Sequence, residues 1–195
     1  MKSLKGSETL KNLMKSFAGE SQARNRYTFF ASKAKKEGYL QISAFFTETA
    51  QNEKEHAERF YKYILKGMDT IDAIEITADF PVHLGDTLSN LKSAAAGENE
   101  EWSALYPAFA DKAREEGYPE IAFTYEHILQ AEQAHEKRFL TLAQNIEEGK
   151  VFKRDQEVQW ICSNCGYIHT GNEAPQVCPA CEHPQSYYEL FCQNY

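Results

Sequence analysis

The stretch Glu53-Lys-Glu-His56-Ala-Glu-Arg-Phe60 decides the fold, because it recurs as Glu132-Gln-Ala-His135-Glu-Lys-Arg-Phe139. In each copy a glutamate precedes a histidine by three residues, and residues at this spacing are neighbours on one face of a helix. One helix can therefore offer a carboxylate oxygen and an imidazole nitrogen to the same metal ion. Two such helices are typical of bundles that bind a pair of metals through carboxylates.

Two further matches show that the chain contains an internal repeat. Ala18-Gly-Glu20 recurs as Ala96-Gly-Glu98, and Lys36-Glu-Gly-Tyr39 recurs as Glu115-Glu-Gly-Tyr118. The first match has an offset of 78 residues, whereas the second match and the Glu-x-x-His match have an offset of 79. The second half has therefore gained one residue.

The added residue lies between Glu98 and Tyr106, because Tyr106 already matches Tyr27 at the larger offset. An extra residue inside a helix usually forms a single π-type turn, and such turns are frequent at functional sites. The counterpart of Glu101 in the first half is Ala23. We therefore predict a π-bulge near Glu101 that turns this additional carboxylate toward the bundle interior.

Glycine and proline divide the first part of the chain into segments of helical length and composition. Very short connections around Gly38 and Gly117 indicate antiparallel helix pairs, whereas a long connection containing Pro81 joins the two pairs. One long crossover between two helical hairpins is the ferritin-like form of the four-helix bundle. The expected helices are 8–37, 40–66, 86–116 and 119–147.

These helices together supply a complete set of ligands for two metals. A single Glu-x-x-His motif is weak evidence, because glutamates on helices usually face solvent, but here both copies fall at equivalent repeat positions. Five buried carboxylates would be prohibitively unfavourable without cations. Oxygen-rich ligation with one imidazole per metal suits iron or manganese, although ligand type alone also allows zinc. The expected ligands are Glu20, Glu53, His56, Glu98, Glu101, Glu132 and His135.

Tyr27 lies seven residues after Glu20 and therefore points to the same helix face. Tyr106 is its repeat partner. Both could be ordinary core aromatics whose hydroxyls need partners. We favour the interpretation that they donate hydrogen bonds to ligand carboxylates.

The C-terminal segment carries a second metal pattern. Cys162-x-x-Cys165 and Cys178-Pro-Ala-Cys181 form a four-thiolate motif that fits tetrahedral zinc or a single iron. Residues 160–195 are too few for an apolar core alone, so a metal would stabilise them. Cys192 is expected to be a free thiol. The aromatic residues expected around the site are Trp160, Tyr167, Tyr187, Tyr188 and Phe191.

We therefore expect a mainly α chain with three parts. Residues 1–147 form the ferritin-like bundle, residues 148–159 a polar linker leading into an extended segment, and residues 160–195 a small β/loop metal module.

Composition excludes several other classes of function. The net charge of −8 and the pI near 5.3 disfavour nucleic acid and anionic membranes as partners. No apolar run approaches the length of a membrane span, and no secretory signal is apparent. The paired cysteines then indicate metal ligands of a cytoplasmic protein rather than disulfides.

The Cys-Gly-Tyr and Cys-Pro-x-Cys segments resemble the metal-binding turns of rubredoxin, a one-iron electron carrier. With the bundle motifs, essentially the whole chain resembles rubrerythrin. The resemblance implies a non-haem di-iron peroxidase that reduces hydrogen peroxide to water in oxidative-stress defence. It also implies electrons from rubredoxin or an NAD(P)H-dependent reductase that enter at an Fe(Cys)4 site. A homodimer is implied in which the module of one subunit serves the bundle of the other.

Two alternatives remain at this point. A ferroxidase or iron-handling ferritin-like protein would use the same bundle, and an inert bundle with a structural zinc module would have no redox activity. Within the peroxidase interpretation, we hypothesise that Glu98 and Glu101 exchange as ligands when the iron pair changes oxidation state.

Overall fold

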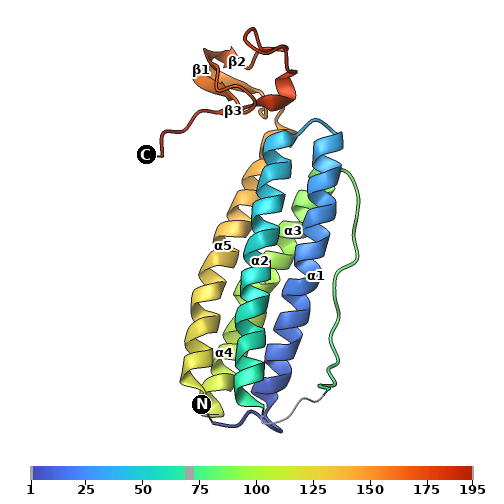
Figure 1. The fold of residues 1–195 in the computed structure, drawn as a ribbon, viewed down its shortest axis with the longest axis vertical. Coiled ribbons are helices and arrows are strands. Elements are labelled where there is room, and N and C mark those ends of the chain that lie inside the picture. The colour runs from blue at the N-terminus through green and yellow to red at the C-terminus, as the bar shows by residue number, and fades with distance from the viewer. Residues whose placement is uncertain (1, 69–72, 195) are drawn as a thin grey trace.

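The computed structural model describes residues 2–68 and 73–194, and most of them are helical (Figure 1). Residues 69–72 of the expected long connection lie outside the described residues. The four expected helices are present with ends within one residue of the predicted ones, and the third is a single rod of three consecutive segments, the middle one π-helical. The predicted ferritin-like four-helix bundle is thus confirmed. Its elements are α1 (Glu8–Lys36), α2 (Leu40–Gly67), α3 (Thr87–Glu100), η1 (Glu101–Leu105), α4 (Tyr106–Glu115) and α5 (Pro119–Glu147).

Two equivalent glutamates of the repeat join the hairpins to each other. The carboxylate of Glu37, after α1, accepts hydrogen bonds from the backbone N–H (2.8 Å) and hydroxyl (2.5 Å) of Thr87, at the start of α3. The carboxylate of Glu116, after α4, accepts equivalent bonds of 2.8 and 2.6 Å from Thr9 of α1. A negative charge beside a helix N-terminus is favourable. Each hairpin therefore caps a helix of the other.

The bundle core consists of two apolar clusters. Phe60 and Tyr125 pack in one cluster with ring centroids 4.9 Å apart, and Phe46 and Phe139 pack in the other at 5.1 Å. Phe60 and Phe139, the last residues of the two repeated stretches, belong to opposite clusters, and both are fully buried. The Glu-x-x-His residues lie between these clusters as a polar layer.

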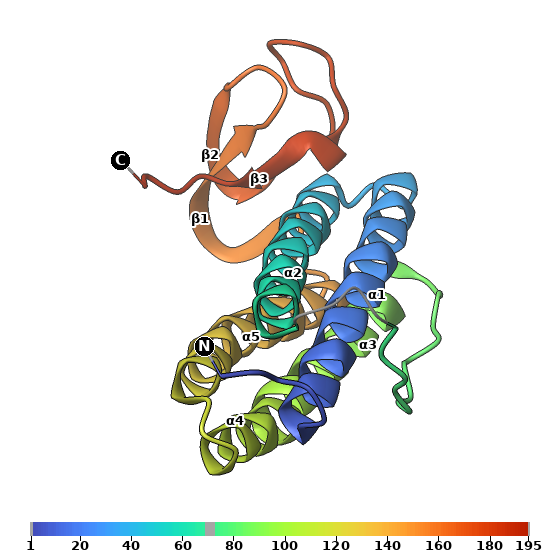
Figure 2. The same ribbon diagram turned by 60° about the horizontal axis from the view of Figure 1, so that its bottom comes forward.

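The connection between the hairpins runs along the outside of the bundle beside α1 (Figures 1 and 2). Residues 73–86 of this connection have no regular secondary structure. It ends at Asp86, whose carboxylate accepts a 2.8 Å hydrogen bond from the backbone N–H of Ser89 and so caps α3.

A small three-stranded sheet lies at the end of the bundle where α1 meets α2 (Figure 1). Its strands β1 (Lys153–Cys162), β2 (Ile168–Glu173) and β3 (Tyr188–Leu190) are antiparallel in the order β2-β1-β3, with the short helix η2 (Gln185–Tyr187) before β3. β1 begins inside the stretch expected as a linker. Tyr39 of the bundle stacks on Phe152 at 6.5 Å between centroids, which attaches the module to the bundle end.

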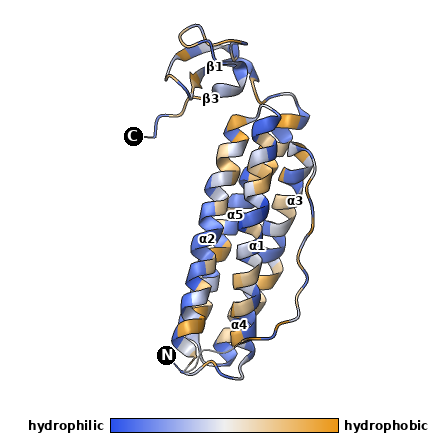
Figure 3. Cartoon of the chain, turned by 45° about the vertical axis from the view of Figure 1, so that its right-hand side comes forward, coloured by the Kyte–Doolittle hydropathy of each residue, from blue (hydrophilic) through white to orange (hydrophobic). Residues whose placement is uncertain are grey.

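Hydrophilic residues interrupt each long helix (Figure 3). Among the described residues, no helix is long and apolar enough to cross a membrane.

Candidate metal centres

The helix that carries the additional glutamate contains a π-type turn, as the repeat offset predicted. η1 covers Glu101–Leu105, and the backbone N–H of Tyr106 donates to the carbonyl of Glu101, five residues earlier. Pro107, which has no N–H to donate, follows directly. The single residue inserted into the second half is therefore absorbed beside Glu101.

The four helices bring six of the seven expected ligands into two overlapping groups. Within each group, one ligand atom from every residue lies within 4.8 Å of the others. Glu53 and Glu132 belong to both groups, so each can bridge two metals. The first group is Glu20, Glu53, His56 and Glu132, and the second is Glu53, Glu98, Glu132 and His135.

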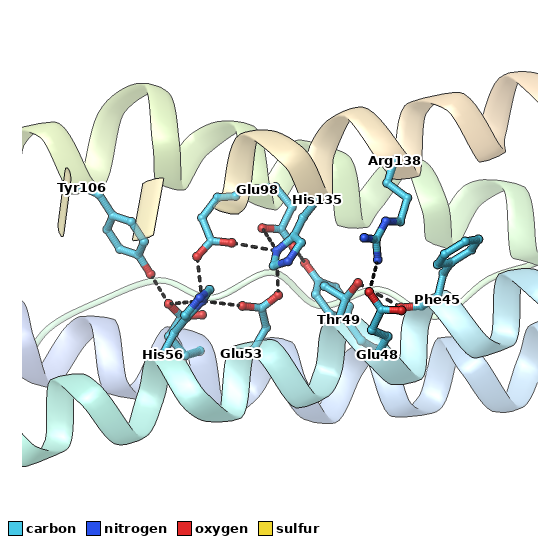
Figure 4. A network of polar contacts seen from close by, with 12 residues as sticks. Phe45, Glu48, Thr49, Glu53, His56, Glu98, Tyr106, His135 and Arg138 are labelled. Carbon is cyan, nitrogen blue, oxygen red and sulfur yellow. Dashed lines mark hydrogen bonds and ion pairs between the residues drawn. The ribbon is translucent and has the colours of Figure 1, made fainter. Parts of the chain in front are cut away.

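The two histidines occupy equivalent positions in these groups. His56 Nδ1 lies 2.9 Å from Glu132 Oε1 and 3.0 Å from Glu53 Oε2. His135 Nδ1 lies 2.8 Å from Glu132 Oε2 and 3.2 Å from Glu53 Oε1. Figure 4 shows Glu53 between the two imidazole rings, whose centroids are 6.1 Å apart. The outer carboxylates are Glu20, 3.7 Å from His56, and Glu98, 3.6 Å from His135.

The unused hydrogen-bonding capacity of these carboxylates fits a metal pair. Glu20, Glu53, Glu98 and Glu132 are at most 1 % exposed. Glu20 and Glu98 each have one buried carboxylate oxygen without a hydrogen-bond partner, and Oε1 of Glu53 and of Glu132 is approached only by an imidazole nitrogen. Buried oxygens without partners are strongly unfavourable, whereas hard divalent cations bind such oxygens well. The donor set therefore fits two cations.

The electrostatics of the metal-free cluster show why cations are needed. Burial and neighbouring carboxylates raise the pKa of Glu20 and Glu98 well above the usual range. Burial alone would lower the pKa of His56 and His135, but hydrogen bonds to the carboxylates outweigh it and raise the values to about 10 and about 12. Burial opposes ionisation of Glu132, but both imidazoles outweigh it and lower its pKa to about 2. Protons thus take the place of cations, and metal binding must release them.

Glu101 lies outside both groups. Its Oε1 atom is 3.8 Å from the position that a Cβ on Gly19 would occupy, so its carboxylate faces α1. Burial first, and then the charge of Glu98, raise its pKa. Glu101 is also the carboxylate that most strongly raises the pKa of Glu20. Exchange between Glu98 and Glu101 at one metal finds no support in this geometry, because Glu98 belongs to the group around His135.

Tyr27 and Tyr106 each donate a hydrogen bond to a carboxylate from the other half of the repeat. Tyr27 Oη donates to Glu98 Oε1 at 2.5 Å, and Tyr106 Oη donates to Glu20 Oε1 at 2.6 Å. Both tyrosines are 1 % exposed. Such bonds orient the outer carboxylates of the two groups.

Two cavities border the cluster. One of about 540 Å³ lies between α2 and α5 and is lined by His56, Arg59 and Tyr63, among others. Another of about 320 Å³ lies beneath the crossover and includes Glu101 and Tyr106 in its lining. Small molecules can therefore approach the cluster from two sides.

The sequence analysis missed Arg26, which is buried beside this cluster. Its guanidinium lowers the pKa of Glu101, against the larger raising effect of burial. The repeat contained a signal for it, because the counterpart of Arg26 at the offset of 79 is Leu105. Glu101 also departs from the repeat, since its counterpart is Ala23, and its charge is opposite to that of Arg26.

The four cysteines of the module form the second cluster. Their sulfur atoms lie within 4.8 Å of one another, with Cys162 3.8 Å from Cys181 and Cys165 3.7 Å from Cys178. Cys162 and Cys178 are buried, whereas Cys165 is exposed. Four thiolates at this spacing fit one tetrahedral metal.

Two similar turns position the cysteine pairs. The N–H of Gly166 donates to the carbonyl of Cys162 at 2.8 Å, and the N–H of Glu182 donates to that of Cys178 at 2.9 Å. Gly166 and Glu182 both have positive φ, of 78° and 59°. The backbone N–H of His183 lowers the pKa of Cys181 to about 6, which favours the thiolate.

The aromatic surroundings of the module match the expectation except at one residue. Trp160 and Tyr188 are buried with the cysteines, and Tyr167 and Tyr187 pack against them. Phe191, directly after β3, is not part of this cluster as the structure describes it. Cys192 is exposed and free, as expected.

Comparison with known proteins accounts for both clusters. The rubrerythrin family matches residues 11–143, and the family's rubredoxin-like domain matches residues 160–189. The chain is 61 % identical to a rubrerythrin of Clostridium perfringens and 54 % identical to one of Nitratidesulfovibrio vulgaris, with both chains covered completely in each case.

Solved structures agree with this assignment. Nigerythrin in its fully reduced, all-ferrous state is 32 % identical with a TM-score of 0.64, and the match covers 97 % of this chain and 92 % of nigerythrin. A bacterioferritin of Desulfovibrio desulfuricans, with 23 % identity and a TM-score of 0.63 over 73 % of this chain and 82 % of its own, shares the fold alone. The chain therefore belongs to the rubrerythrin family, as an iron protein with a di-iron site in its bundle and a one-iron, rubredoxin-like site in its C-terminal module.

Proposed function

We propose that this chain reduces hydrogen peroxide to water in oxidative-stress defence, with electrons that enter through the rubredoxin-like site. The observation that carries the proposal is the presence of a two-metal cluster and a one-metal cluster in one chain. Reduction of peroxide to two water molecules consumes two electrons and two protons. A pair of ferrous ions held by the bundle ligands would supply one electron each, and a one-electron carrier held by the four cysteines could return them singly.

The protein's own groups prepare the site for this reaction. Glu53 and Glu132 lie in both ligand groups and so fix the separation of the two metal positions. Tyr27 and Tyr106 orient the outer carboxylates. The cavity between α2 and α5 admits a small neutral substrate to the side of His56, whose side chain is 15 % exposed against 6 % for His135.

We further propose that Glu101 is a conditional ligand of the metal near Glu20 and His56. An anionic carboxylate stabilises a ferric ion more than a neutral imidazole does. In this structure His56 is in the ligand group and Glu101 is outside it. We therefore expect His56 to serve the ferrous ion and Glu101 to join the ligands on oxidation.

Electron delivery within one chain has to cover a long distance. The module contacts the bundle near Gly38, where a Cβ would lie 3.9 Å from Ser186. Glu53 lies fifteen residues further along the sequence, about 22 Å at the helical rise per residue. Because electron transfer slows steeply with distance, we propose a homodimer in which each module serves the partner's bundle.

Peroxide turnover by the iron-loaded protein, with reduced rubredoxin and an NAD(P)H-dependent reductase as donors, tests the proposal. We expect the Glu53→Gln chain to be inactive. The di-iron site of a pre-reduced Cys162→Ser chain should be oxidised once by peroxide, and rubredoxin should then fail to reduce it again. Dimers that combine the two variants should recover turnover. Peroxide consumption no faster than that by free iron would refute the proposal, and iron uptake into a large cage would favour the iron-handling alternative.

A further inference from the structure

Arg26 is a buried guanidinium with unused hydrogen-bonding capacity. It is 8 % exposed, and its Nε donates to Gln22 Oε1 at 2.7 Å. Its Nη1 atom is buried without a hydrogen-bond partner, and the guanidinium lies 5.6 Å from the ring centroid of Tyr27. No carboxylate in the described part of the chain lies within ion-pair distance of it. A buried cation without a counter-charge is costly and requires an explanation.

The surroundings of Arg26 direct it toward Glu101. Its Nη2 atom lies 3.6 Å from the position of a Cβ on Gly97. Gly97 of α3 precedes Glu101 by four residues, so the two residues lie on the same side of the continuous helix formed by α3 and η1. On α1, Gly19 lies seven residues before Arg26, on the side toward which a helical arginine leans. Glu101 Oε1 approaches this same Gly19 to 3.8 Å.

The guanidinium and the carboxylate thus share the space between Gly19 and Gly97. Neither glycine fills this space with a side chain. The two charged residues are also departures from the repeat, since their counterparts are Leu105 and Ala23. Two opposite charges at positions that are apolar in the other half indicate a paired role.

We propose that Arg26 is a positioning residue for Glu101 in the iron-loaded protein, where its guanidinium attracts the Glu101 carboxylate once the metal has released it. This inference rests on the proposed role of Glu101 as a conditional ligand. Without Arg26, a Glu101 carboxylate released from the metal would be a partly buried anion without a cationic partner. It would therefore remain on the metal, and the ferric state would be favoured.

The midpoint potential of the di-iron site tests this role, because it does not depend on peroxide turnover. We expect Arg26→Met to shift the Glu101 equilibrium toward the metal by about tenfold, which lowers a one-electron potential by about 59 mV. Arg26→Lys keeps the charge, so its potential should stay close to that of the unaltered protein. Arg24→Met, at an exposed position on the same helix, removes an equal charge and should leave the potential unchanged.

A second background separates positioning from a general effect of charge. In Glu101→Gln protein, Arg26→Met should no longer change the potential, because the carboxylate on which Arg26 acts is gone. An equal shift in both backgrounds, or none in either, would overturn the proposal.

The melting temperature of the metal-free Arg26→Met protein should equal or exceed that of the unaltered protein, because Arg26 forms no ion pair among the described residues when no metal is bound, and the substitution removes an unpaired buried charge. A clear decrease would assign Arg26 a structural role instead and would also overturn the proposal. Failure of the proposed peroxidase function would appear separately, as absent turnover by the unaltered protein, while the potentials could still be measured.

Discussion

Removal of the Tyr106 hydroxyl should weaken metal binding without disturbing the core. The hydroxyl donates a 2.6 Å hydrogen bond to Glu20 Oε1, and the other oxygen of Glu20 has no hydrogen-bond partner. The ring packs against Phe60 at 5.8 Å and against Tyr125 at 5.4 Å between centroids. Tyr106→Phe preserves these ring contacts and deletes only the bond that orients the carboxylate.

The expected loss follows from the type of bond removed. A hydrogen bond to a charged group contributes about 1.5–3 kcal/mol, and loss of a partner of a metal ligand typically lowers affinity about 10- to 100-fold. We expect a loss in this range for the metal near Glu20. Anaerobic titration of the metal-free protein with ferrous iron against a competing chelator measures it.

Tyr125→Phe is the matched control. Tyr125 is equally buried in the same cluster, but its hydroxyl bonds to Ser16 at 3.0 Å instead of to a carboxylate. The control should retain affinity within about twofold, a change of less than 0.5 kcal/mol. Equal affinities of the two variants would refute the reasoning that the Tyr106 hydroxyl supports a ligand.

Three further predictions concern pH, the module and the helix caps. The metal-free protein should lose stability in calorimetry as pH rises from about 6.5 toward about 10, because folded His56 then binds a proton that the unfolded chain has released. Cys162→Ser should abolish the visible spectrum of the one-iron site while the bundle retains two irons by metal analysis. Glu116→Ala should destabilise the protein by about 1–2 kcal/mol in denaturant unfolding, because two backbone N–H groups at the start of α1 lose their acceptor.

Each of these predictions has a distinct contradicting outcome. A metal-free protein that grows more stable over the same pH range would show that His56 is not held by the carboxylates when folded. Loss of bundle iron in Cys162→Ser would show that the two sites assemble together. Glu115→Ala, at an exposed neighbouring position, is the control for the cap, and equal destabilisation by both variants would remove the capping argument.

The sequence alone determined the bundle and both ligand motifs. Hydrophobic and charged residues at helical spacing, with glycine at the breaks, fixed the four helices to within one residue. The change of repeat offset from 78 to 79 located the π-turn, because a backbone insertion has a local effect that a one-dimensional comparison can detect. The four-cysteine spacing likewise specified one metal cluster, since the two short turns are encoded by neighbouring residues.

The tertiary structure decided which groups share a metal. Glu53 and Glu132 lie on different helices, and only the packing of α2 beside α5 shows that both belong to both ligand groups. The exclusion of Glu101 from these groups and its approach to Gly19 depend on how α1 and the π-turn meet. The repeat marks Arg26 as a departure, but only the folded structure shows that it is buried without an ion-pair partner. The burial of a side chain and the charges around it depend on residues that are distant in sequence, so they are defined only in the folded chain.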